Sequence, residues 1–347
     1  MTIRLTVLFP PLRSWRSSLA LGLLAPLFLV TAAQAQDPLD EMRSLAHSRL
    51  PVQLLLNQGM TLLYGPASQA LENSDSDGLE AFGAAAGGRQ EVSRAGHTKV
   101  DGFSFLAGLG RRASIEDSPL AAFSYGFFAE GGTGDIETRQ TFDNGTTTRS
   151  EGRGRYVGGG FLLKTEFQNR IHMNGAFRVG QAAASLKTLD GAVDPPDSSG
   201  VYFSAGGGLG WQAFLMDQLE LDVYGRLLWS RQGAGEKRVI AGQGLVGVSA
   251  VNSTRTNLGA RADFQAGGGR VIYVGAAWEH EFNGRAELAA GSRTLPGPFA
   301  DLEGDSLIGE VGLKLAGEDG LSASFGLDGS WGRREALGGV LRLGYEF

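Results

Sequence analysis

Apolar and polar residues alternate along most of this sequence, and this period of two limits the fold more than any other feature. Near the end of the chain, Leu341, Leu343 and Tyr345 share one face, whereas Arg342 and Glu346 fall on the other. Successive side chains of a β-strand point to opposite faces, so the pattern predicts strands with one apolar face. After residue 79 we find no apolar run of about 18 residues, the length that indicates a membrane-spanning helix.

A soluble β-sandwich also alternates, but three further features favour a membrane barrel. Many alternating segments reach about ten residues, the length of a strand that crosses a bilayer. Aromatic residues gather near the ends of the apolar face, as Trp229, Trp331, Tyr345 and Phe347 do, and such rings prefer the membrane interface. The opposite face carries charges in the middle of strands. We therefore expect the charged face to line a water-filled lumen and the apolar face to meet lipid.

The alternating segments number twelve, an even count as in bacterial single-chain barrels. The expected strands occupy residues 79–88, 98–112, 120–133, 153–168, 170–187, 200–215, 218–233, 253–266, 270–284, 305–317, 320–332 and 335–347. Long polar links are expected near 134–152, 188–199, 234–252 and 285–304, with a turn at Asn144 and Gly145. A sheet in lipid must close because no backbone donor can stay unpaired there. The sequence thus predicts an all-β, antiparallel, twelve-stranded transmembrane barrel.

Charged residues on the polar face are the candidate functional residues. We expect them to form a paired, hydrated network that also grips whatever occupies the lumen, with Arg226 and Arg261 holding it in place. The expected lumen-lining charges are Glu130, Lys164, Glu166, Arg178, Glu220, Asp222, Arg226, Arg261, Asp263, Glu279, Glu281, Glu310, Lys314 and Arg342.

Residues 1–35 are typical of a secretory signal peptide. Arg4, Arg13 and Arg16 precede an apolar run over 19–30, and the sequence AQA at 33–35 predicts cleavage after Ala35. The alternative, a membrane anchor, needs a run of about 20 apolar residues. The chain has no cysteine and a net charge of −6, which fits an exported envelope protein and disfavours a nucleic-acid binder.

Residues 36–78 form a separate segment before the expected barrel. Leu39, Met42 and Leu45 have helical spacing, and we expect Pro51 to interrupt the helix and Pro66 to end the helical tract. A helix of about 20 residues covers about 30 Å, the thickness of a bilayer, so this segment is long enough to thread the lumen. The alternative is a disordered or periplasmic leader.

The sequence offers little for catalysis. We expect His172 to face the lumen, whereas alternation places His280 on the face opposite Glu279 and Glu281, so these three residues share no site. There is no G-x-S-x-G elbow, no cysteine, and no Gly-Lys-Ser or Gly-Lys-Thr after the glycine runs. We therefore expect no enzyme activity, no metal and no cofactor.

Seven segments resemble the C-terminal translocator domain of type V autotransporters, which are outer-membrane proteins of Gram-negative bacteria. RLPVQLLLNQG (49–59) is similar to the linker helix of members with little passenger. FGAAAGG (82–88) and HTKVDGFSFLAGLG (97–110) resemble the first hairpin. LDVYGRLLWSRQ (221–232), NSTRTNLGARADF (252–264) and YVGAAWEHEF (273–282) resemble later strands, and GYEF (344–347) is similar to the outer-membrane ending. Each segment is a weak motif, but their order matches the family.

The resemblance implies a monomeric barrel in outer-membrane lipid, over residues 79–347. It implies insertion by the barrel assembly machinery, with help from periplasmic chaperones and with Tyr345 and Phe347 as the assembly signal. It also implies export of the chain's own N-terminal segment through the lumen, by type V secretion. This chain departs from the family because residues 36–78 leave almost no passenger. Asn57 and Asn73 are solitary, so we expect no self-cleavage.

Two other functions remain open at this point. The first is a standalone outer-membrane channel or porin, with the N-terminal segment outside the lumen. The second is a surface-interaction barrel that acts through its long extracellular loops, near 134–152, 234–252 and 285–304.

Overall fold

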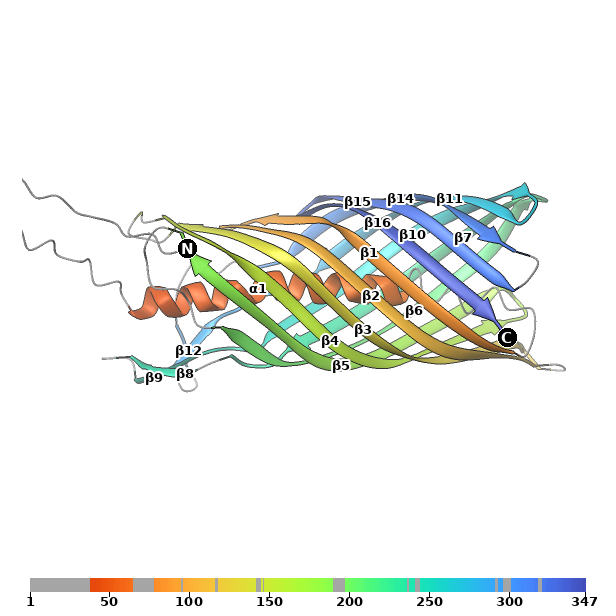
Figure 1. The fold of residues 1–347 in the computed structure, drawn as a ribbon. Helices are drawn as coiled ribbons and strands as arrows, with labels where there is room; N and C mark the ends of the chain where they lie inside the picture. Colours follow the sequence, from red (N-terminus) through yellow and green to blue (C-terminus); the bar gives the residue numbers. More distant parts are fainter. Residues whose placement is uncertain are drawn as a thin grey trace, which may run out of the picture. The chain divides into compact units, whose positions relative to one another are not determined.

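The computed structural model describes most of the chain after residue 37 (Figure 1). The described residues are 38–64, 78–94, 96–115, 118–141, 145, 147–189, 197–235, 237–240, 244–290, 293–295, 301–317 and 320–347. The expected signal peptide, Pro66, Asn73 and Asn144 lie outside these residues. Within them, no helix combines the length and the apolar character needed to span a membrane.

Twelve antiparallel strands close into a barrel, which confirms the predicted fold class. They are β1 (Leu79–Ser93), β2 (His97–Ser114), β3 (Leu120–Thr141), β4 (Thr147–Phe167), β5 (Ile171–Thr188), β6 (Ser198–Met216), β7 (Leu219–Gln232), β10 (Val251–Gly267), β11 (Arg270–Glu281), β14 (Gly304–Ala316), β15 (Leu321–Gly332) and β16 (Arg334–Glu346). Neighbours along this series pair with each other, and β1 pairs with β16 from Glu80↔Glu346 to Val92↔Arg334, so the sheet has no free edge.

The predicted loop over 134–152 was wrong, because strands continue through most of it. β3 and β4 stay paired from Gly134↔Gly154 to Thr141↔Thr147, and the chain reverses around Gly145, which has a φ of 80°. The pattern explains the extension. Ile136 alternates inward and is fully buried, whereas Asp135 faces outward and pairs with Arg153 at 3.2 Å.

A second, smaller sheet forms at the barrel end that carries the long connections. Its strands are β8 (Lys237–Ile240), β9 (Gly244–Val248), β12 (Leu288–Ala290) and β13 (Arg293–Thr294), in the order β13-β12-β9-β8. The sequence predicted only loops over 234–252 and 285–304. These short apolar stretches form strands because Val246, Val248 and Leu288 pack into one buried cluster with Ala46.

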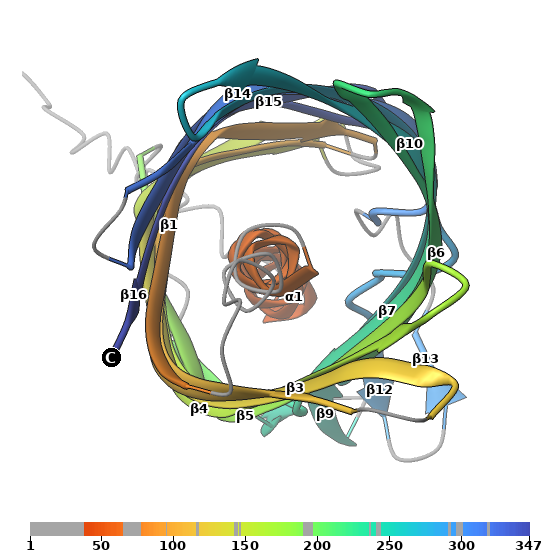
Figure 2. The ribbon, with the colours of Figure 1, turned by 90° about the vertical axis from the view of Figure 1, so that its right-hand side faces the viewer.

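Helix α1 (Pro38–Leu62) runs inside the barrel, as the view along the barrel axis shows (Figure 2). The expected break at Pro51 does not occur, because the helix continues through it. Leu50, Val52, Leu54 and Leu55 on successive faces are all buried. A helix with buried residues on successive faces is typical of a core position. Here the barrel wall surrounds Pro51 and packs against the helix both before and after this residue.

The barrel strands carry two chemically different faces. Large apolar side chains are exposed on the outside, among them Leu341, Trp229 and Trp331. Buried residues that point inward include Ser324 on β15 and Arg342 on β16. Apolar groups outside and polar groups inside are the arrangement of a membrane barrel rather than of a soluble sandwich.

Candidate functional site: the helix held in the barrel lumen

Three glycines on neighbouring strands form a flat strip under the middle of α1. Gly102 on β2, Gly134 on β3 and Gly154 on β4 are direct cross-strand partners. The Leu55 side chain lies against all three, since a Cβ atom added at these glycines would lie 2.7, 3.0 and 2.9 Å from its methyl carbons. Any larger residue in this strip would push α1 away from the wall.

One turn further along α1, Gly59 allows two wall side chains to approach the helix backbone. A Cβ at Gly59 would lie 2.6 Å from Nη1 of Arg178 and closer still to the Tyr156 hydroxyl. Tyr156 meets Tyr202 edge to face, with ring centroids 5.9 Å apart. The Arg178 guanidinium lies 5.7 and 5.2 Å from the two ring centres. Aromatic and cation–π contacts therefore fix this arginine against the helix.

Two arginines from different parts of the wall donate to consecutive backbone carbonyls of α1. Arg178 on β5 donates to the carbonyl oxygen of Leu56 at 2.6 Å, and Arg255 on β10 donates to that of Asn57 at 3.3 Å. A backbone carbonyl is present at every residue of a helix. This part of the grip therefore does not depend on which side chains the helix carries.

Buried acids hold both arginines in place. Glu130 accepts a hydrogen bond from Arg178 at 2.8 Å and another from the Tyr202 hydroxyl. Glu279 pairs with Arg255 at 3.0 Å. Because each arginine is almost fully buried, a paired carboxylate is needed to offset the loss of solvent around its charge.

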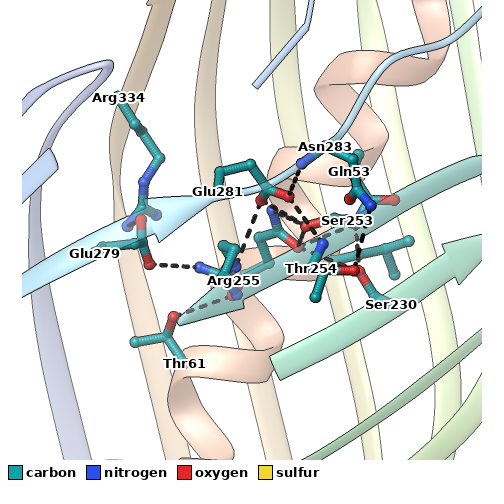
Figure 3. Close-up of polar contacts among 12 residues, drawn as sticks. Gln53, Thr61, Ser230, Ser253, Thr254, Arg255, Glu279, Glu281, Asn283 and Arg334 are labelled. Atoms are coloured by element: carbon teal, nitrogen blue, oxygen red, sulfur yellow. Dashed lines mark hydrogen bonds and ion pairs between the residues drawn. The ribbon is translucent and has the colours of Figure 1, made fainter. Parts of the chain in front are cut away.

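The Arg255 region forms a connected polar network (Figure 3). Glu279 also pairs with Arg334 on β16 at 2.7 Å, so one carboxylate joins two arginines from different strands. Next to it, Glu281 accepts a hydrogen bond from Ser253 at 2.7 Å and another from the backbone of Thr254 at 2.8 Å. The network thus links β10, β11 and β16 at the level of the helix.

Three polar side chains of α1 complete the contact with the wall. Gln53 donates to Ser230, and Asn57 donates to Ser253 at 3.3 Å. On the opposite wall, the Ser104 hydroxyl donates to Gln58 at 3.0 Å. These hydrogen bonds depend on side chains, and so they fix the register of this particular helix in the lumen.

A cavity lies on the other side of α1. Its wall comes from β7, β10, β11, β14, β15, β16 and the middle of β1, and Gln58, Thr61 and Leu62 form its helical side. Glu310 and Asp328 face this cavity from directly opposite positions on β14 and β15. The helix therefore fills the lumen on one side and leaves space on the other.

The expected lumen-lining charges lie in several separate groups. Most of them form ion pairs inside the barrel: Glu130 with Arg178, Lys164 with Glu166, Asp263 with Arg261 and Lys314, Asp222 with His172, and Glu279 with Arg255, at distances of 2.6 to 3.0 Å. Glu220 is half-buried, Arg342 is buried, and Glu281 and Glu310 lie as described above. The expected charges, from Glu130 to Arg342, therefore do not form a single site.

The expectation that Arg226 and Arg261 hold the helix was wrong. Arg226 lies over the Tyr224 ring at 3.8 Å, and Arg261 lies over the Tyr273 ring at 3.9 Å. Among the described residues, neither arginine forms a hydrogen bond or an ion pair with α1. Stacking on a neighbouring tyrosine keeps each of them along the wall.

Sequence reasoning missed Arg255, which holds the helix instead. A signal was present, because Arg255 has the same parity as Arg261 and so belongs to the inward face of the same strand. Tyr156 and Tyr202 were also missed, since a tyrosine on the polar face carries no distinctive pattern. Their role depends on the register between strands, which alternation alone does not define.

Within the part of the chain that the structure describes, no group of three or more His, Asp or Glu residues is placed to hold a metal ion. Ser93 and His97 lie 3.0 Å apart on the exposed β1–β2 hairpin, but no acid contacts His97 among the described residues. His280 pairs with Asp305 on the outer face, away from Glu279 and Glu281, which are buried inside.

The chain end lies on the outer face of the barrel. Tyr345 and Phe347 are both exposed there, with ring centroids 5.0 Å apart. The backbone nitrogen of Phe347 donates to the carbonyl of Leu79 at 3.0 Å, so the last residue is joined to the first strand. Both rings are therefore accessible from the lipid side.

Comparison with known proteins was made by sequence and by structure. No protein-family model and no curated protein matches the sequence. The translocator domain of autotransporter NalP from Neisseria meningitidis is similar in structure, with a TM-score of 0.60 and 14% identity over 88% of this chain and 97% of that one. The β domain of the Bordetella autotransporter BrkA has a TM-score of 0.60 and 17% identity over 78% and 100% of the two chains.

The transport unit of autotransporter AIDA-I from Escherichia coli is also similar, with a TM-score of 0.57 and 18% identity over 86% of this chain and 99% of that one. All three structures are translocator or β domains, and each is covered almost completely. At these identities the likeness concerns the fold. This chain is a twelve-stranded antiparallel β-barrel with the fold of autotransporter translocator domains.

Proposed function

We propose that this protein is a translocator-type barrel that exports its own N-terminal segment and then keeps it in the lumen, with little or no passenger. The observation that supports this most directly is the path of the chain. Ala46 of α1 packs with the small sheet at the long-loop end, whereas Leu62 and Tyr64 pack beside Phe82 near the start of β1. α1 therefore begins at the end of the barrel opposite to the one where β1 begins.

The orientation follows from the lengths of the connections. Outer-membrane barrels carry short turns in the periplasm and longer loops at the cell surface. In this orientation α1 starts at the surface and the chain returns to the periplasmic end before β1. The hydrogen bonds from Arg178 and Arg255 to backbone carbonyls of α1 support the same role, because they do not depend on the side chains of the segment. They therefore suit a segment that enters the lumen as an extended chain and remains there as a helix.

The remaining parts of the proposal concern location and partners. Residues 1–35 act as a signal peptide that is cleaved after Ala35, and the barrel is monomeric in outer-membrane lipid. The barrel assembly machinery and periplasmic chaperones deliver it, with Tyr345 and Phe347 as the assembly signal. Its role is transport without catalysis, and it binds no nucleic acid.

Single-channel conductance in a planar bilayer tests the plugged lumen. The mature chain is compared with a variant that lacks residues 36–65. We expect low conductance in the mature chain and a large increase after the deletion. High conductance in both proteins would contradict the proposal and favour the standalone channel.

Cysteine labelling tests the orientation, because the chain has no cysteine of its own. Asp40→Cys lies in the first turn of α1, and Asn169→Cys lies in the β4–β5 turn at the other end. A membrane-impermeant maleimide added to intact cells is expected to label Asp40→Cys and to leave Asn169→Cys unlabelled. Labelling only at residue 169 would contradict the proposed orientation and indicate the reverse one.

A further inference from the structure

A groove crosses three strands of the barrel wall. Its floor is the backbone of a cross-strand row formed by Tyr156, Ala182 and Gly200, whose side chains point inward. Its sides are the two adjacent outward rows: Arg155, Ala183 and Ser199 on one side, and Val157, Gln181 and Val201 on the other. The groove therefore opens on the outside of the barrel and not into the lumen.

The groove lies where the apolar outer face ends. Below it on β4, the outward residues Val157 and Phe161 are apolar and exposed, and Val201 and Phe203 continue the same surface on β6. Above it, the outward positions of β4 become charged, beginning with Arg155. In a membrane, this level is the boundary between the hydrocarbon and the headgroups.

The charge around the groove favours an anionic occupant. Arg155 is exposed and forms no hydrogen bond or ion pair with the described residues. Further up, Arg149, Arg153 and Lys187 share the outer face with Asp135, Glu137 and Glu151. Of these, Arg153 is already paired with Asp135. Arg155 is thus an available guanidinium next to small residues that leave its approach open.

We propose that this groove binds a phosphorylated lipid of the outer leaflet, and this rests on the surface-facing orientation proposed above. The guanidinium of Arg155 binds a headgroup phosphate in the paired geometry that arginine offers to phosphate oxygens. The Gln181 amide and the Ser199 hydroxyl provide further polar contacts. One acyl chain lies along Val157 and Val201, which continue into the apolar belt.

The occupant is a lipid rather than a soluble anion because the site has two chemically different parts. A free phosphate gains nothing from the apolar side chains of Val157 and Val201 at the edge of the groove. A neutral lipid fits the apolar part but leaves Arg155 without an anion. Only a molecule with a phosphate at the headgroup level and an acyl chain below it satisfies both.

The test is binding of lipid A to the full mature chain in detergent micelles, measured by native mass spectrometry. Bisphosphorylated lipid A is compared with its dephosphorylated form. Arg155→Glu is expected to weaken binding of the phosphorylated lipid by about tenfold or more, because it replaces a charge-assisted hydrogen bond with a repulsion. Binding of the dephosphorylated lipid is expected to stay unchanged.

Arg231→Glu is the matched control. Arg231 is exposed on β7, two residues beyond the exposed Trp229, and lies outside the groove. We expect this change to have little effect on binding. Equal losses in Arg155→Glu and Arg231→Glu would mean that general surface charge attracts the lipid, and this would overturn the site.

A double variant, Ala183→Leu with Ser199→Leu, fills the groove and keeps Arg155. We expect it to lose the phosphorylated lipid, and unchanged binding would overturn the groove as its seat. Each variant is checked for the compact barrel by its heat-dependent migration on a gel. The conductance test stands apart from these measurements, so a plugged barrel with no lipid selectivity would reject this inference alone.

Discussion

The two sides of α1 meet the barrel wall in different ways. Towards β2–β5, Leu55 lies on the strip of Gly102, Gly134 and Gly154, and Gly59 receives Tyr156 closely. Towards β11 and β14–β16, the helix faces the cavity. Both walls are rich in small residues, yet the helix packs more closely against the first.

The difference shows that small residues allow close packing but do not produce it. On the cavity side, Gly326, Ala336 and Gly338 are as small as the glycines under Leu55. The residues of α1 that border them are the polar Gln58 and Thr61, with the apolar Leu62 only at the end of the helix. The position of the helix is decided by Arg178 and Leu55 on one wall, and the opposite wall borders an open space.

The largest effect is expected from Arg178→Met, which removes the arginine from the packed side. Glu130 is then buried without its partner, and breaking such a pair costs about 3–5 kcal/mol. We expect the free energy of unfolding in lipid vesicles to fall by that amount and the conductance to rise. Arg226→Met on the cavity side is the control, with an expected loss below about 1 kcal/mol. Equal losses would remove the distinction between the two sides.

A smaller effect is expected from Gly59→Leu, which adds a side chain where Tyr156 and Arg178 leave no room. Overpacking of this kind costs about 1–3 kcal/mol, and we expect it to displace α1 and raise the conductance. Thr61→Leu adds a similar side chain to the same helix, but towards the cavity. It is expected to leave conductance unchanged, so an open channel in Thr61→Leu would mean that the cavity is not available space.

Much of this fold could be predicted from the sequence. Alternation identified all twelve barrel strands, because in a membrane barrel each strand must separate lipid from lumen by itself. The same parity could have identified Arg255, six residues before the expected Arg261 on the same strand. The prediction of a loop over 134–152 was wrong because the outward residues there are charged, which is typical of a loop. A strand that extends above the membrane into solvent can carry the same charged residues.

The grip on the helix could not be predicted in the same way. The strip under Leu55 exists only because Gly102, Gly134 and Gly154 are in register across three strands. A shift of one residue in any pairing would break the strip, and a sequence without its register does not specify this. Whether Arg178 or Arg226 binds the helix likewise depends on the neighbouring tyrosines and on where the helix lies.

Serine-to-alanine changes compare single hydrogen bonds on the two sides. Ser104 on β2 donates to Gln58 of α1, whereas the buried hydroxyl of Ser324 on β15 has no hydrogen-bond partner among the described residues. We expect Ser104→Ala to lower the free energy of unfolding by about 0.5–1.5 kcal/mol. Ser324→Ala is expected to be neutral or slightly stabilising. The same urea titration measures both, and a larger loss for Ser324→Ala would contradict the assignment.

The smallest effect is expected where the wall faces the cavity. Ala336→Leu on β16 extends into that space, and we expect the free energy of unfolding to change by less than about 0.5 kcal/mol, as at an exposed surface. Ala182→Leu makes the identical change on the packed side, where Ala182 is buried with Tyr156 and Tyr202. There the added methyl groups must displace the rings, at about 1–3 kcal/mol. Because chemistry and added volume are the same, a difference between the two variants measures only the space beside the helix. Equal costs would mean that the helix lies at the centre of the lumen in the folded protein and packs equally against both walls.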